Sequence, residues 1–327
     1  MKILVVSGFL GAGKTTFIKE LARRTHRDFA IMENEYGEVG IDGQLLQEGQ
    51  APAAEKVNIW ELTEGCICCS MKSDFATAVL TIANTVDPEF LIVEPTGVGM
   101  LSKVLENLAK IQYEKISLLS PVTILDGNSF DRYLSEFPEI YRDQLAAAGS
   151  ILVSKMESAD SATLDALNEK LAGISPAAEI CTSHYSENPD TWWQGLLQRP
   201  CAGAPPLPVE EADTQLKNLG LTDIWLDSPN HLILFLQGVV SGVFGGICRA
   251  KGYLKTGGAW LRFDVADRTY SITGIEAQPD SRAVFIGKDL KRNLLREALQ
   301  QDLWAASFKA QGRRQKAAGQ KPLTIRR

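Results

Sequence analysis

A glycine-rich segment close to the N-terminus constrains this chain more than any other feature. Residues 8–16 read GFLGAGKTT, which fits the pattern G-x-x-x-x-G-K-S/T. The apolar run at 3–6 precedes it and predicts a buried strand, and a helical pattern opens at Thr16. Because such a turn directs several backbone N–H groups into one concavity, the segment predicts a site for the phosphates of a nucleotide.

The residues of this segment have separate expected roles. Lys14 would reach the terminal phosphates, and the hydroxyl of Thr15 would hold Mg²⁺. The other predicted nucleotide contacts are Gly8, Gly11, Ala12, Gly13 and Thr16. A glycine turn that fits the pattern by chance is the alternative, and the order strand, loop, helix disfavours it.

Strands and helices alternate along the first half of the chain, with predicted strands at 3–6, 29–32, 57–62, 90–93, 117–125 and 150–153. This alternation predicts an α/β fold, a P-loop NTPase domain with a mostly parallel sheet. A Pro-rich segment separates it from a smaller unit of strands and helices, predicted to be an α+β C-terminal domain. The predicted boundaries are 1–190 for the first domain, 191–217 for the linker, 218–305 for the second domain and 306–327 for a basic, disordered tail.

Composition and charge exclude several classes of function. The net charge of −6 gives no reason to expect a nucleic-acid partner. No apolar stretch approaches the roughly 20 residues that span a bilayer, so no membrane association is predicted. The chain opens in a strand without a basic leader or cleavage pattern, which predicts a cytoplasmic protein.

Three of the six cysteines, Cys66, Cys68 and Cys69, fall within four positions. A turn there could direct all three thiolates at one soft metal ion. Zinc with thiolates prefers four ligands, so three cysteines leave one position open, which suits transfer better than storage. Buried structural cysteines or a redox pair are the alternative.

Two further segments follow predicted strands of the first domain. In the segment 94–97, Glu94 would position the Mg²⁺ shell and the N–H of Gly97 would sense a terminal phosphate. The segment 154–157 follows another strand, and its Ser154, Lys155 and Glu157 are the predicted readers of a guanine base. A charged surface turn is the alternative for the second segment.

Taken together, the motifs GFLGAGKTT, ENEYGEVGID, GCICC and EPTG resemble the CobW-like branch of the P-loop GTPases, which is related to metallocentre-assembly GTPases of nickel enzymes. Residues 249–252 and 284–288 resemble signatures of the C-terminal domain that accompanies this GTPase. The resemblance implies slow GTP hydrolysis coupled to the binding and delivery of a transition metal. It also implies that Glu35 or Glu38, with Glu35 preferred, supplies the fourth metal ligand.

The sequence departs from that family in two places. The base-reading segment is usually N-K-x-D, but this chain has Ser154 and Glu157 at the outer positions, which weakens the guanine preference and leaves ATP use open. Many relatives carry a histidine-rich stretch, whereas this chain has three separated histidines, so any metal function rests on the cysteines.

The expected function is therefore a GTP-binding and GTP-hydrolysing metallochaperone. Its expected cofactors are GTP and Mg²⁺, and its cargo is Zn²⁺ first, with Co²⁺, Ni²⁺ or Fe²⁺ as alternatives. The expected partner is a client metalloprotein, and a nucleotide-dependent homodimer is left open. The alternatives are a P-loop kinase or other ATP-using phosphoryl transferase, a redox or iron–sulfur regulatory protein, and a non-catalytic interaction module.

Overall fold

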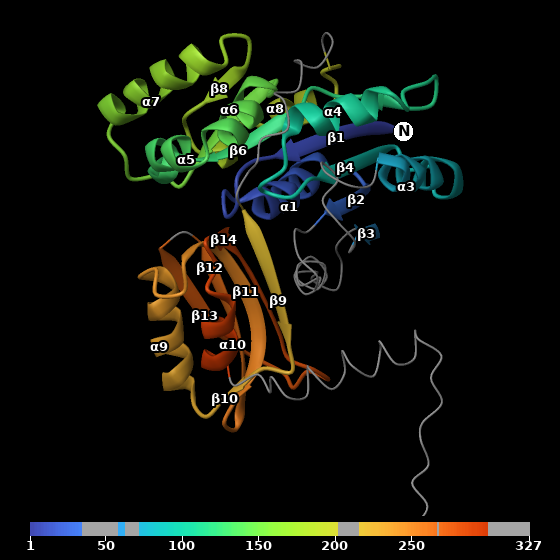
Figure 1. The fold of residues 1–327 in the computed structure, drawn as a ribbon. Coiled ribbons are helices and arrows are strands. Elements are labelled where there is room, and N and C mark those ends of the chain that lie inside the picture. Colours follow the sequence, from blue (N-terminus) through green and yellow to red (C-terminus); the bar gives the residue numbers. More distant parts are fainter. Residues whose placement is uncertain (35–57, 63–71, 202–215, 267, 300–327) are drawn as a thin grey trace, which may run out of the picture.

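A computed structural model of the protein describes residues 1–34, 58–62, 72–201, 216–266 and 268–299, which form two sheets with helices packed on them (Figure 1). In the first sheet the strand order is β3-β2-β4-β1-β6-β7-β8, β5 lies beside β1, and every pairing is parallel. Its strands are β1 (Lys2–Ser7), β2 (Phe29–Asn34), β3 (Asn58–Leu62), β4 (Phe90–Glu94), β5 (Ser117–Leu118), β6 (Val122–Asp126), β7 (Ser150–Ser154) and β8 (Glu179–Cys181). This confirms the predicted α/β fold with a parallel sheet.

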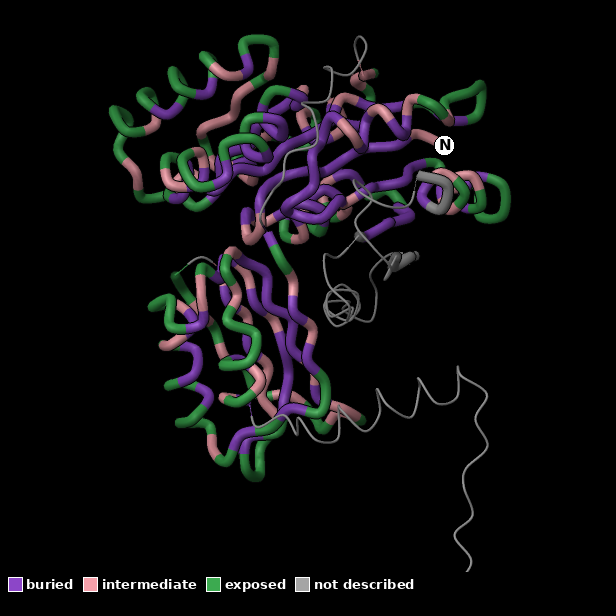
Figure 2. Tube along the Cα trace, viewed as in Figure 1, coloured by how far each residue is buried: buried purple, intermediate pink, exposed green. Residues whose placement is uncertain are grey.

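Helices cover both faces of this sheet because side chains alternate between the faces along each strand. On β1, Ile3 and Val5 pack with residues of α3 and α4, whereas Leu4 and Val6 pack with residues of α1 and α8. The central strands β1, β4, β6 and β7 are accordingly buried along most of their length (Figure 2). The helices are α1 (Lys14–Thr25), α3 (Lys72–Thr85), α4 (Leu101–Ala109), α5 (Phe130–Glu136), α6 (Pro138–Ala146), α7 (Ser161–Ile174) and α8 (Asp190–Leu196), with 3₁₀ turns at Gly127–Ser129 and Tyr185–Glu187.

The single strand predicted over 117–125 is wrong, because the structure divides it into β5 and β6. Pro121 lies between the two strands and has no N–H to donate to a ladder. The intervening residues pair elsewhere: Ser120 N–H donates to the carbonyl of Arg199 at 2.9 Å, and Leu119 forms a bridge with Pro200. Through these backbone contacts, the break between β5 and β6 connects the segment after α8 to the sheet.

The second sheet has the order β13-β12-β11-β14-β9, with β10 beside β11, and its pairings are antiparallel except that of β10. The helices α9 and α10 pack on it through apolar residues such as Leu236 and Leu295. This confirms the predicted α+β C-terminal unit. The elements are β9 (Lys217–Thr222), β10 (Trp225–Leu226), α9 (Pro229–Val240), β11 (Gly246–Thr256), β12 (Ala259–Ala266), β13 (Thr269–Ile275), β14 (Arg282–Lys288) and α10 (Arg292–Ala298).

One apolar cluster joins the two sheets. It contains Phe9 and Phe137 from the first unit together with Cys248, Val284 and Ile286 from β11 and β14. Lys288 adds a polar contact, because its Nζ donates to the carbonyl of Glu136 at 2.7 Å. The C-terminal sheet is therefore packed against the first unit.

The domain boundaries remain a prediction. The predicted boundary at residue 190 coincides with the start of α8, whose Trp193 and Leu196 are buried in the core of the first unit. Within the described part of the chain, no helix has both the length and the apolar character needed to cross a membrane.

Candidate nucleotide-binding site

The phosphate-binding loop connects β1 to α1 at the point where the sheet order reverses, between β4 and β6. Ligands of open α/β sheets bind at such switch points. Gly8, Gly11 and Gly13 have φ angles of 141°, 74° and 103°, which side chains rarely tolerate. A Cβ on Gly8 would also lie 2.2 Å from the carbonyl oxygen of Ile124. These glycines are thus required by the backbone geometry of the loop.

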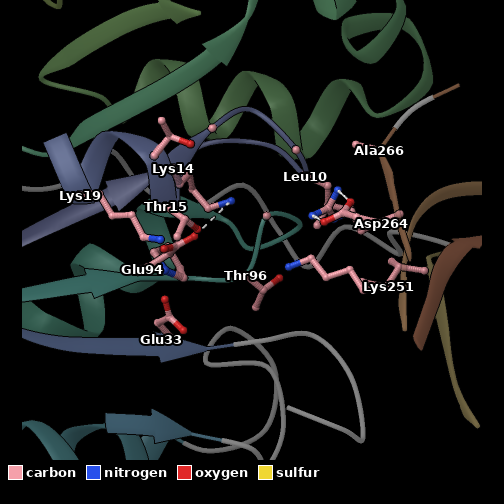
Figure 3. Close-up of a pocket in the computed structure, with 17 residues that line it drawn as sticks. Leu10, Lys14, Thr15, Lys19, Glu33, Glu94, Thr96, Lys251, Asp264 and Ala266 are labelled. Carbon is pink, nitrogen blue, oxygen red and sulfur yellow. Dashed lines mark hydrogen bonds and ion pairs between the residues drawn. The ribbon is translucent and has the colours of Figure 1, made fainter. Parts of the chain in front are cut away.

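A cavity of about 360 Å³ opens beside this loop (Figure 3). One wall consists of the loop itself, the end of β2 and the segment after β4, and the other wall comes from the C-terminal sheet. The residues on the second wall are Arg249, Lys251, Asp264, Ala266 and Ile286. Both units therefore shape the candidate site.

Lys14 and Glu94 face each other at the base of the cavity. Lys14 is buried, and its Nζ donates to the carbonyl of Gly8 at 3.1 Å and lies 3.8 Å from Glu94 Oε1. Thr15 and the buried carboxylate of Glu33 line the same cavity. A hydroxyl and two carboxylates are hard oxygen donors of the kind Mg²⁺ prefers, so Thr15, Glu94 and Glu33 are suited to hold Mg²⁺ directly or through its waters.

The segment after β4 is held tightly against the phosphate-binding loop. A Cβ on Gly97 would lie 2.7 Å from the backbone nitrogen of Leu10, and the Nε2 of Gln144 donates to the Gly97 carbonyl at 3.1 Å. Thr96 is buried, and its Oγ1 accepts a hydrogen bond from Val98 N–H at 3.1 Å. A shift in one segment would therefore displace the other.

The predicted base-reading residues lie at the carboxyl end of β7. Ser154 is buried, and its Oγ lies 2.7 Å from the carbonyl oxygen of Ala12, so it ties this segment to the phosphate-binding loop. Lys155 has a left-handed φ of 62°, and its Nζ lies 2.8 Å from Asp126 Oδ2. Glu157 is more exposed, with its Oε1 3.4 Å from Nε2 of His184. Ser154 thus holds the loop, while base contact by Lys155 and Glu157 stays a prediction.

Comparison with known families agrees with this geometry. Residues 2–182 match the family described as "CobW/HypB/UreG, nucleotide-binding domain". The chain belongs to the CobW/HypB/UreG family. Residues 227–303 match the "Cobalamin synthesis protein cobW C-terminal domain". The family resemblance stated from the sequence motifs is therefore confirmed.

Curated proteins that are similar to this chain have names that describe them as zinc chaperones. The chain is 37% identical over 158 residues to "Zinc chaperone YeiR" of Escherichia coli (strain K12), an alignment covering 47% of this chain and 46% of YeiR. It is 29% identical over 193 residues to "Zinc chaperone YjiA" of the same organism, covering 57% of this chain and 58% of YjiA. The chain thus spans about half the length of the curated relatives it matches.

A solved structure from the same group also aligns with the chain. The crystal structure of Zn(II)-bound YjiA GTPase from E. coli has 22% sequence identity to it and a TM-score of 0.43. That alignment covers 91% of this chain and 97% of the YjiA chain.

The predicted metal ligands of this CobW/HypB/UreG member, Cys66, Cys68, Cys69 and Glu35, lie outside the described residues, as does Glu38. Among the residues that are described, no group of three or more His, Cys, Asp or Glu side chains could hold a metal ion. Three cysteines, Cys181, Cys201 and Cys248, are described and are free thiols. Burial raises the pKa of Cys248 to about 12, so its thiolate is disfavoured as a ligand.

Several site residues were not predicted from the sequence. Glu33 belongs to the acidic segment at 33–42, but nothing in its letters distinguishes it from the neighbouring carboxylates. Arg249 and Lys251 lie in the segment that resembles a family signature, yet their position at this cavity depends on the packing of the second unit. The sequence did offer one signal for these two residues, because their spacing of two places both side chains on one face of a strand.

Proposed function

We propose that this protein is a GTP-binding and GTP-hydrolysing metallochaperone that carries a transition metal, zinc first, to a client metalloprotein. The observation that carries the proposal is the phosphate cavity in a CobW/HypB/UreG nucleotide-binding domain whose sequence also holds the C-x-C-C segment. The printed names of YeiR and YjiA as zinc chaperones support zinc as the cargo.

The nucleotide would bind along the loop at 8–16. The ammonium of Lys14 neutralises the terminal phosphates, and the loop amides with the start of α1 complete the anion site. When bound, Mg²⁺ neutralises phosphate charge, and Thr15, Glu94 and Glu33 are the residues that would hold it. The amide of Gly97 would detect the terminal phosphate.

The cargo would bind at Cys66, Cys68 and Cys69, with Glu35 as fourth ligand. The strand order supports coupling to the nucleotide, because β2 lies between β3 and β4 and pairs in parallel with both. Asn34 at the end of β2 is paired with Leu62 at the end of β3. Glu35 follows the first of these residues directly in the sequence, and the cysteine segment follows the second.

The proposed cycle couples the two sites. GTP orders the acidic segment and brings its carboxylate to the thiolates, and hydrolysis releases that segment and loosens the metal. Coupling of this kind is reciprocal, so metal must change nucleotide affinity by the factor by which nucleotide changes metal affinity. The client metalloprotein, a cytoplasmic location and a nucleotide-dependent homodimer belong to the same proposal.

Zinc titrations of the protein loaded with a non-hydrolysable GTP analogue or with GDP test this function. We expect tighter zinc binding in the triphosphate form, a matching change of nucleotide affinity in zinc, and GTP turnover. Replacing Cys66, Cys68 and Cys69 by Ser should remove zinc binding and keep nucleotide binding, whereas Lys14→Ala should abolish tight GTP binding and turnover. Identical zinc affinity in both nucleotide forms would overturn the coupling, and turnover of ATP in place of GTP would overturn the nucleotide assignment.

A further inference from the structure

The C-terminal sheet contributes charged side chains to the phosphate cavity. Arg249 and Lys251 alternate with buried Ala250 along β11, so both side chains point from the same face of the strand. Asp264 on β12 is paired with Lys251 in the sheet register and also lines the cavity. All three residues come from the C-terminal domain, whereas the phosphate-binding motif lies in the first domain.

This sheet is in contact with the phosphate-binding loop itself. A Cβ on Gly11 would lie 2.9 Å from the Cβ of Ala266 and 3.8 Å from Nη1 of Arg249. Gly11 also has a left-handed φ of 74°. Only glycine therefore allows the loop and β12 to approach this closely.

Arg249 is fixed in place by its partners. Its two terminal nitrogens donate to the two oxygens of Asp264 at 2.6 and 2.9 Å, and Nη1 also lies 3.2 Å from the Val265 carbonyl. The Arg249 side chain is 14% exposed. Because a two-point Arg–carboxylate pair is geometrically rigid, it holds the Arg249 side chain against β12, beside the loop, and makes Arg249 a positioning residue.

Lys251 has a different orientation. Figure 3 shows its side chain extending from the C-terminal sheet across the cavity toward Thr96, on the wall formed after β4. That wall is where the terminal phosphate of a nucleotide would lie, beyond Lys14 and Thr15. An ammonium on a flexible stem is a suitable partner for a phosphate oxygen.

We propose that Lys251 contacts the terminal phosphate of a bound nucleoside triphosphate, and that the Arg249–Asp264 pair positions it. This inference rests on the proposed function. It gives the C-terminal domain a role in that function, which is to distinguish a bound nucleoside triphosphate from a bound diphosphate. Loss of the terminal phosphate on hydrolysis would remove this contact. The C-terminal domain would thereby respond directly to whether a triphosphate or a diphosphate is bound.

Equilibrium titrations with fluorescent GDP and a fluorescent β,γ-imido analogue of GTP, in Mg²⁺, test the assignment. Lys251→Met removes the charge and keeps most of the stem. We expect it to lower affinity for the triphosphate analogue by about tenfold or more and affinity for GDP by less than about twofold. Lys251→Arg keeps a cation and should retain most of the difference between the two nucleotides.

The matched control is Lys255→Met on the same strand, because Lys255 is exposed and lies outside the residues that line the cavity. An unchanged triphosphate-to-diphosphate ratio in folded Lys251→Met protein, or an equal loss in Lys255→Met, would overturn the assignment. If Lys14→Ala abolishes binding in the same experiment, the proposed function still stands. Failure of the unaltered protein to bind either nucleotide would overturn both proposals.

Discussion

At the scale of single residues, the close approach of Gly97 to Leu10 makes a specific prediction. The Cβ of Gly97→Ala would lie 2.7 Å from Leu10 N and 2.9 Å from Leu10 Cα, so backbone must move. We expect a loss of roughly 1–3 kcal/mol in stability from this overpacking. We also expect a greater loss of triphosphate than of diphosphate affinity, because the displaced amide is the one proposed to detect the terminal phosphate. Urea unfolding and nucleotide titration measure the two effects.

A helical glycine provides the control for this substitution. Gly173 lies in α7, and a Cβ there would meet no atom within 4 Å. Gly173→Ala should stabilise the protein by up to about 1 kcal/mol and leave nucleotide binding unchanged. Equal nucleotide affinities in the Gly97→Ala protein and the unaltered protein would contradict a sensing role for this segment.

At the scale of elements, an ion-pair network fixes α1, the helix that follows the phosphate-binding loop. Glu20 accepts hydrogen bonds from Arg23 and Arg24, and Arg24 continues to Asp190 of α8 and to the Ser186 carbonyl. The hydrogen bond from Arg23 is the largest cause that lowers the pKa of Glu20 to about 2. The charged form of Glu20 is thus favoured in the folded protein.

This lowered pKa predicts a pH-dependent contribution to stability. A carboxyl whose folded pKa is depressed stabilises the fold above its unfolded value of 4.5, and the contribution is lost as pH falls from there toward about 2. Since Arg23 is 64% exposed, we expect Glu20→Gln to cost only about 1 kcal/mol at pH 7. Urea unfolding at pH 7, 5 and 3 should show this difference shrinking below pH 4.5.

The exposed Glu169 on α7 offers a control of the same chemistry. Glu169→Gln should change the free energy of unfolding by less than about 0.5 kcal/mol across the same pH range. A Glu20→Gln effect that is constant from pH 7 to pH 3 would show that packing, rather than charge, explains its cost.

The elements that sequence reasoning predicted best are those whose pattern is local. The strands β1, β4 and β7 are short apolar runs because helices cover both faces of a parallel sheet, and their letters alone predicted them. The phosphate-binding loop was predicted for the same reason, since its residues are contiguous. The break between β5 and β6 was not predicted, although Pro121 is a local signal for it. Its pairing with Arg199 and Pro200 could not be predicted, because those residues are distant in sequence.

At the scale of the whole molecule, the part of the candidate site that sequence could not predict is the wall supplied by the second unit. The spacing of Arg249 and Lys251 indicates that they share one face of a strand, but only the packing of the second unit against the loop brings that face to the cavity. Alternation along β14 explains that packing, because Val284 and Ile286 join the cluster of the first unit while Phe285 joins the core beneath α9. One strand thus belongs to two cores.

Because β14 is shared by both cores, we expect nucleotide binding in the first unit to stabilise the second sheet as well. Val284→Ala removes two buried methyl groups where the units meet, and Val265→Ala removes the same groups from the core of the second unit alone. Both should cost roughly 1–3 kcal/mol of stability. Hydrogen exchange with and without Mg²⁺ and a non-hydrolysable triphosphate should reveal slower exchange in β11 and β14 on binding. We expect Val284→Ala to weaken that protection and Val265→Ala to keep it. Equal protection from hydrogen exchange in both variants would mean that nucleotide binding affects the second sheet only through the cavity wall. The shared core would then not contribute.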